Sequence, residues 1–136
     1  MESLYKETTY LMKKYGITAN KKLGQNFLID EAVVNTIVEK SEITKEDLVI
    51  EIGPGLGTLT QRLLQQAGQV VCIELDERML QILKERFVLY DNFEVINEDV
   101  LKINLKELIR SYKEKEGIQR VKIVANLPYY ITTPII

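Results

Sequence analysis

Residues 48–57 have the sequence Leu-Val-Ile-Glu-Ile-Gly-Pro-Gly-Leu-Gly. The first half is an apolar run of the length of a buried β-strand, and glycines follow at alternate positions 53, 55 and 57. Glycines at this spacing let the backbone turn sharply and let a ligand lie against it without interference from Cβ atoms. The sequence therefore predicts a strand followed by a turn suited to a ligand. An ordinary tight turn between strand and helix is the alternative interpretation.

On the carboxyl side, short apolar runs alternate with helical stretches. Strands are expected at residues 48–52, 70–75, 93–97 and 121–125, with helices at 58–67, 77–87 and 105–112 between them. Strands this apolar are expected to be buried on both faces of a parallel sheet. Right-handed crossovers then make a doubly wound, Rossmann-like α/β sheet, which binds ligands at the carboxyl ends of its strands.

Two helices are expected before the first strand. Apolar residues from Leu4 to Tyr15 recur at helical spacing, and Gly16 is a natural stop for this helix. Asp30 is suited to cap a second helix, and residues 44–47 have turn chemistry. Residues 1–22 carry five lysines against two glutamates, a charge of +3, whereas the whole chain has −2. These lysines either contact RNA or form a solvated face.

Composition excludes several classes of protein. The chain has 136 residues, no histidine and one cysteine, Cys72, which lies in an apolar run and is expected in the core. A disulfide within the chain, a zinc site and the usual catalytic triads therefore have no residues to form them, and we expect no metal. The sequence has neither a long apolar span nor an apolar signal-peptide core, so the expected location is cytoplasmic, without a membrane partner.

The spacing of the glycines bears on the type of ligand. Dinucleotide sites use G-x-G-x-x-G, whose glycines place a pyrophosphate on a helix N-terminus. Here the third glycine of that pattern would fall at Thr58 or Thr60. The spacing suits a nucleoside cofactor without phosphates, and a nicotinamide-dependent oxidoreductase is the alternative that this spacing disfavours.

Acidic residues follow the second and third strands. Glu74 stands about 20 residues beyond the first glycine, where Rossmann-type sites place an acid that accepts hydrogen bonds from ribose hydroxyls. Asp76 is placed to cap the next helix, and we favour that role for it. Asp99, in preference to Glu98, is positioned to accept a hydrogen bond from an adenine amine, with Val100 packing against the ring. The alternative is a solvated acidic turn.

The fourth strand is followed by Asn126-Leu127-Pro128-Tyr129-Tyr130, the most specific feature of the chain. An adenine amine is a poor nucleophile because its lone pair is delocalised into the ring. The side-chain oxygen of Asn126 and the carbonyl of Leu127 are suited to accept its N–H groups and favour the attacking, pyramidal form. Tyr129 is suited to stack on an extruded base. The alternative is a proline-containing turn whose aromatic residues fill an apolar wall.

Taken together, these motifs resemble the ribosomal RNA adenine N6-dimethyltransferase family. The resemblance rests on Gly24-Gln25-Asn26-Phe27-Leu28, the glycine turn, Glu74-Leu75-Asp76, Glu98-Asp99 and Asn126-Leu127-Pro128-Tyr129. It implies a class I methyltransferase fold with S-adenosyl-L-methionine as cofactor. Carried onto matching positions, the resemblance implies a cofactor site made by Asn26, Leu28, Gly53, Gly55, Glu74, Asp99 and Asn126. It implies a target-adenine site made by Asn126, Leu127 and Tyr129. It also implies phosphate contacts made by Lys21 and Lys22.

Within the family, the sequence is more similar to the small-subunit (16S) enzymes than to the large-subunit enzymes of macrolide resistance. The implied substrate is two adjacent adenines in a hairpin near the 3′ end of 16S rRNA, met in a small-subunit precursor and dimethylated during ribosome biogenesis. A non-catalytic nucleic-acid-binding protein on the same fold is the alternative function.

Family members continue beyond the position of Ile136 with further strands and a small helical domain. We therefore expect residues 1–29 to form a basic helix and loop, and residues 30–136 a partial methyltransferase domain with strand order 3-2-1-4. The last strand then becomes an exposed edge. This predicts that the chain has little activity by itself and associates through that edge.

Overall fold

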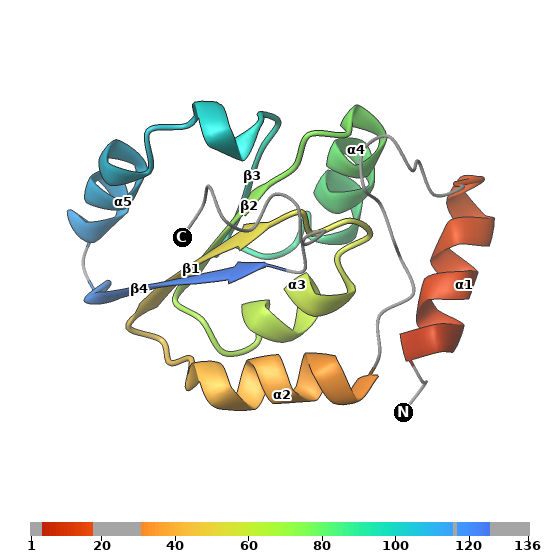
Figure 1. The fold of residues 1–136 in the computed structure, drawn as a ribbon, viewed down its shortest axis with the longest axis horizontal. Coiled ribbons are helices and arrows are strands. Elements are labelled where there is room, and N and C mark those ends of the chain that lie inside the picture. The colour runs from red at the N-terminus through yellow and green to blue at the C-terminus, as the bar shows by residue number, and fades with distance from the viewer. Residues whose placement is uncertain (1–3, 18–30, 116, 126–136) are drawn as a thin grey trace.

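A four-stranded parallel sheet forms the centre of the protein in this computed structural model, which describes residues 4–17, 31–115 and 117–125 (Figure 1). Its order is β3-β2-β1-β4, as the family resemblance implied. The strands are β1 (Asp47–Ile52), β2 (Gln69–Ile73), β3 (Phe93–Ile96) and β4 (Arg120–Ala125). Val49 of β1 is aligned with Val70 of β2 and with Lys122 of β4. In this order the chain adds β2 and β3 on one side of β1 and then crosses to add β4 on the other side. Open α/β sheets bind ligands at the point where the order reverses in this way, here between β1 and β4.

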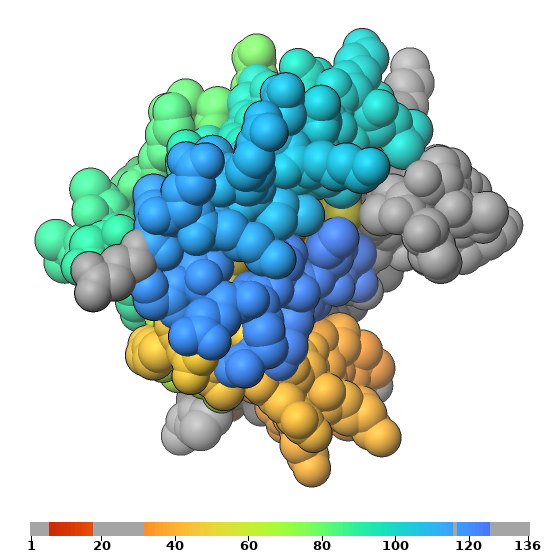
Figure 2. All heavy atoms as spheres, turned by 90° about the vertical axis from the view of Figure 1, so that its left-hand side faces the viewer, coloured from red at the N-terminus to blue at the C-terminus, as the bar shows by residue number. Residues whose placement is uncertain are grey.

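Helices cover both faces of the sheet. One face packs against α2 (Glu31–Ser41), α3 (Thr58–Leu64) and α4 (Glu77–Arg86), and the other against α5 (Leu105–Lys113). Figure 2 looks onto the α5 side, where α5 lies beside β4. Among the described helices, none combines the length and the apolar character that a membrane crossing requires.

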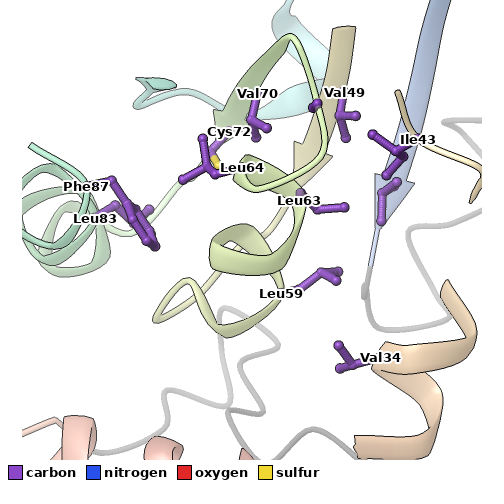
Figure 3. Packing of buried hydrophobic residues seen from close by; sticks show 12 residues of the cluster. Val34, Ile43, Val49, Leu59, Leu63, Leu64, Val70, Cys72, Leu83 and Phe87 are labelled. Carbon is purple, nitrogen blue, oxygen red and sulfur yellow. The ribbon is translucent and has the colours of Figure 1, made fainter. Parts of the chain in front are cut away.

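The larger apolar core lies between the sheet and the three helices on one face. Figure 3 shows side chains from α2, α3 and α4 converging on the strands, among them Val34, Leu63 and Leu83. Cys72 is part of this core, as expected, and is fully buried. On the opposite face, Tyr112 of α5 covers Ile50 and its neighbours on β1 and β2. Two separate cores of this kind hold the sheet between helix layers.

The expectation that every strand is buried on both faces is correct only for the central strands. All six residues of β1 are buried, and so are residues 70–73 of β2. In contrast, β3 and β4 are edge strands, and Ile123 of β4 is 47% exposed within the described part of the chain. In sequence, the apolar residues of β3 and β4 resemble those of central strands. Composition alone does not show that a strand lies at an edge of the sheet with only one neighbouring strand.

Local signals predicted several element ends correctly. The side chain of Asp76 accepts the Arg78 amide at 2.8 Å and caps α4, as predicted. Gly16 follows the first helix, α1 (Leu4–Tyr15), with φ of +61°. The third helix ends at Leu64, three residues before the predicted end at 67. The predicted cap Asp30 lies outside the described residues.

The first helix packs on the outside of α3 and α4. Leu11 and Ile17 join Leu56, Met79 and Ile82 in a third apolar cluster. A helix at the start of the chain thus contacts the residue between two glycines of the turn after β1.

Candidate functional site

Three strands end at the same edge of the sheet and are joined there by backbone hydrogen bonds. Gly53 donates to the carbonyl of Ile73 at 3.0 Å, and Glu74 donates to the carbonyl of Ile96 at 2.9 Å. Because parallel strands bring their carboxyl ends together, the segments after β1, β2 and β3 become neighbours. This edge contains the described residues that the sequence assigned to the cofactor, which are Gly53, Gly55, Glu74 and Asp99.

The glycine turn, residues 53–57, has the conformation that its glycines permit. Gly53, Gly55 and Gly57 have φ of +68°, +59° and +87°, a region that residues with a side chain rarely adopt. Gly57 donates to the Pro54 carbonyl at 3.0 Å and stands at the N-terminus of α3. A Cβ at Gly57 would lie 2.7 Å from the ring of Phe87, so this glycine is also required by packing.

Glu74 links the second strand to this turn. Its Oε1 accepts the Gly55 amide at 3.1 Å, and its Oε2 accepts the Asp76 amide at 3.0 Å. Burial raises the pKa of Glu74, while the amides of Asp76 and Gly55 oppose that rise. Each carboxylate oxygen has a second lone pair, so the side chain retains capacity to accept hydrogen bonds from a ligand.

The third strand contributes Asn97 and Asp99. The Asn97 side-chain amide donates to the carbonyl of Glu74 at 2.9 Å and to that of Leu75 at 3.2 Å. Asp99 accepts the Leu101 amide at 2.9 Å and thereby caps the short 3₁₀ turn Val100–Lys102. Sequence reasoning gave Asn97 no role, although a polar residue directly after a strand was the available signal.

Glu51 is a second residue whose position sequence reasoning did not foresee. It points into the core behind the glycine turn, where the Thr60 hydroxyl donates to it and the thiol of Cys72 lies 3.7 Å away. Burial raises the pKa of Glu51 to about 7 despite these hydrogen bonds, and the nearby Glu74 adds to the rise. A single acidic residue in an apolar strand gives no indication in the sequence that Thr60 and Cys72 will lie beside it.

The remaining predicted site residues lie outside the described part of the chain. These are Asn26, Leu28, Asn126, Leu127 and Tyr129, together with Lys21 and Lys22. Of the predicted site residues that the structure describes, Gly55 and Glu74 are hydrogen-bonded, and Gly53 and Asp99 lie at the same edge of the sheet.

The described site suits a nucleoside better than a phosphate. The segments 53–57, 74–76 and 97–99 offer carboxylates, while most of their backbone amides already donate within the protein, and they contain no lysine or arginine. Carboxylates accept hydrogen bonds from hydroxyl and amino groups and repel phosphate. Leu75, beside Glu74, is exposed and offers apolar surface to a ring. Carboxylate acceptors beside an exposed apolar side chain fit the hydroxyls of a ribose and the ring of an adenine, as in S-adenosylmethionine.

Comparisons with known proteins identify the family of the chain. The model of the family described as "Ribosomal RNA adenine dimethylase" matches residues 16–136. The "Ribosomal RNA small subunit methyltransferase A" of Clostridium botulinum (strain Okra / Type B1) is 54% identical over 129 residues, which cover 95% of this chain and 45% of that protein. The chain thus spans about half the length of the curated relatives that it matches.

Solved structures show the same fold. The crystal structure of the 23S rRNA methyltransferase ErmE has a TM-score of 0.65 and 33% identity, covering 81% of this chain and 41% of that one. An RNA methyltransferase from Salinibacter ruber, in complex with S-adenosyl-L-homocysteine, has a TM-score of 0.52 and 17% identity, covering 71% and 59%. The sheet order and the match over residues 16–136 lead to one conclusion: the chain belongs to the ribosomal RNA adenine dimethylase family.

Proposed function

We propose that this chain forms the cofactor-binding part of an S-adenosylmethionine-dependent rRNA adenine-N6 dimethyltransferase. The observation that carries the proposal is the hydrogen bond between Glu74 and the Gly55 amide, which unites the acidic residue and the glycine turn in one site. Family membership supports the same reaction, and the S-adenosyl-L-homocysteine bound by the S. ruber enzyme supports the cofactor.

Each described residue has a proposed role toward the cofactor. Glu74 accepts hydrogen bonds from the ribose hydroxyls, and the backbone at Gly53 and Gly55 allows close approach of the ligand. Asp99 accepts a hydrogen bond from the adenine amine while its other contact caps the 3₁₀ turn. When bound, S-adenosylmethionine supplies an already activated methyl group. The protein therefore contributes orientation and electrostatics and does not need a strong general base.

The roles of the residues outside the described part rest on the motif match alone. Asn26, Leu28 and Asn126 complete the cofactor site, and Lys21 and Lys22 contact RNA phosphates. Asn126 and the Leu127 carbonyl accept hydrogen bonds from the target amine, while Tyr129 stacks on the base.

The proposed substrate is a pair of adjacent adenines in a hairpin near the 3′ end of 16S rRNA. Curated relatives named as small-subunit methyltransferases, among them the 54% identical protein of C. botulinum, support this choice of subunit. The reaction would take place in the cytoplasm, on a small-subunit precursor. The division of the chain at residue 30, its low activity by itself and its association through β4 stay predictions. Methylation of such a precursor by the monomeric 136-residue chain would contradict the second of them.

Isothermal titration of the 136-residue chain with S-adenosylmethionine and S-adenosylhomocysteine tests the cofactor assignment. We expect saturable binding that Glu74→Ala weakens. Glu77→Ala is the matched control, because Glu77 is exposed in the first turn of α4, three residues from Glu74. Tighter binding of NAD than of S-adenosylmethionine would favour an oxidoreductase and overturn the proposal.

A further inference from the structure

Glu7, on the N-terminal helix, forms ion pairs with two arginines from other helices. Its Oε1 lies 3.3 Å from Nη2 of Arg86 on α4, and its Oε2 lies 3.5 Å from Nη2 of Arg62 on α3. The three side chains are only 17%, 13% and 22% exposed in the order Glu7, Arg86, Arg62. Shielding from water makes such pairs more sensitive to loss of one partner than pairs on an open surface.

Both arginines bind the backbone around the glycine turn. Arg86 donates through Nη1 to the carbonyl of Leu56 and through Nη2 to Gln61 at 3.2 Å. Arg62 donates to the carbonyl of Thr58 at 2.6 Å. Glu7 is therefore linked to the turn through Arg86 and to the first residue of α3 through Arg62.

The side chain of Leu56 packs against α1, the helix that carries Glu7. It is buried in the cluster that includes Leu11 and Ile17, from α1 and the residues after it. Leu56 stands between Gly55 and Gly57, which have little conformational preference of their own. Its position must therefore come from contacts with the rest of the protein. The Gly55 amide next to it is the donor to Glu74.

We propose that α1 positions the glycine turn for the cofactor, and that Glu7 is a positioning residue acting through Arg86 on the Leu56 carbonyl. The match to the family model begins at residue 16, so α1 lies outside it. The proposal rests on the proposed function for its cofactor and does not depend on methyl transfer.

The electrostatics give the physical reason. Burial and the neighbouring Arg62 lower the pKa of Arg86, whereas Glu7 raises it. Without the charge of Glu7, two cations remain close together in a shielded place. Arg86 then gains by turning toward water, which releases the Leu56 carbonyl and the turn.

Hydrogen exchange and titration of four chains test the inference: unmodified, Glu7→Gln, Arg86→Lys and the double variant. Lysine keeps the charge but cannot reach Leu56, Gln61 and Glu7 at once. Glu85→Gln is the control, because Glu85 is the exposed neighbour of Arg86. In Glu7→Gln we expect exchange of the amides of Gly55 and Gly57, both hydrogen-bonded in the turn, to rise about tenfold, with unchanged exchange in β1 and β2. We also expect the Kd for S-adenosylmethionine to rise about tenfold.

The pattern of exchange separates positioning from general support. If Glu7→Gln raises exchange uniformly through β1 and β2, or leaves the turn unchanged, the inference is wrong. If Glu7→Gln does not fold, Arg86→Lys gives the same comparison. We expect the double variant to behave as Arg86→Lys does, because both changes interrupt one chain of contacts. A further outcome is that the unmodified chain shows no binding of S-adenosylmethionine while Glu7→Gln still loses protection from hydrogen exchange only in the turn. That result would refute the proposed function, but the positioning of the turn by Glu7 would stand.

Discussion

The Gly55 amide donates to Oε1 of Glu74 across 3.1 Å, and this bond joins the turn after β1 to the end of β2. The second oxygen of the same carboxylate accepts the Asp76 amide at the start of α4. Glu74 therefore has two separable functions, the support of two backbone segments and the proposed recognition of the ribose.

Substitution of Glu74 by glutamine and by alanine should separate these functions. Glutamine keeps an oxygen for the Gly55 amide but loses the charge and places its NH2 group opposite the Asp76 amide. Glu74→Gln should therefore weaken S-adenosylmethionine binding, with a loss of stability smaller than that of Glu74→Ala. Glu74→Ala leaves both amides without their acceptor and should also lower the free energy of unfolding by about 2 kcal/mol. Urea unfolding beside calorimetric titration measures both effects. Equal stability of the two variants would show that the carboxylate does not support the turn.

Gly57→Ala should be far more damaging than Gly16→Ala. Both glycines have positive φ, but a Cβ at Gly57 meets Phe87 at 2.7 Å, whereas one at Gly16 meets nothing within 4 Å. We expect Gly16→Ala to cost about 1 kcal/mol of unfolding free energy from backbone strain alone. Gly57→Ala adds an overlap with a buried ring and should cost about 3 kcal/mol or more. Thermal unfolding of the two variants side by side is the measurement, and similar losses would contradict the packing argument.

Glu51 should make stability depend on pH. Its pKa is about 7 in the folded protein, against an ordinary value of 4.5 that the unfolded chain should keep. The folded state therefore binds more protons between these values, so the free energy of unfolding should fall as pH rises through this window, by about 3 kcal/mol. Glu51→Gln keeps an acceptor for Thr60 and should remove this part of the dependence. Denaturant unfolding at pH 5 and pH 8 compares the two chains, and parallel pH dependences would argue against a raised pKa.

Thr8→Val should stabilise the protein. Among the described residues, the hydroxyl of Thr8 is the buried side-chain polar atom without a hydrogen-bond partner. Valine has nearly the same shape, so removal of the unsatisfied hydroxyl should raise the free energy of unfolding by about 1 kcal/mol. Thr9→Val, at the exposed neighbouring position, is the control and should leave stability within about 0.5 kcal/mol. A loss of stability in Thr8→Val would mean that the hydroxyl has a partner in solution.

Much of the fold followed from local patterns. Apolar runs marked all four strands, the glycines at 53, 55 and 57 marked the turn, and Asp76 marked the start of α4. These signals are short in range, since a glycine with positive φ or a cap acts within a few residues of itself. The strand order and the common edge of Gly55, Glu74 and Asp99 came from the family resemblance together with the rules of parallel sheets.

Contacts between distant segments were beyond the reach of such patterns. Three contacts join residues far apart in the chain. The Asn97 side-chain amide donates to two carbonyls at the end of β2, Glu51 is buried beside Cys72, and Glu7 pairs with Arg86. The same residue types at the surface would look identical in sequence. The sequence by itself determined the secondary-structure elements and the glycine turn, through local backbone chemistry. The tertiary structure decided the surroundings of each polar side chain, because its burial and its charged neighbours exist only once the helices have packed on the sheet.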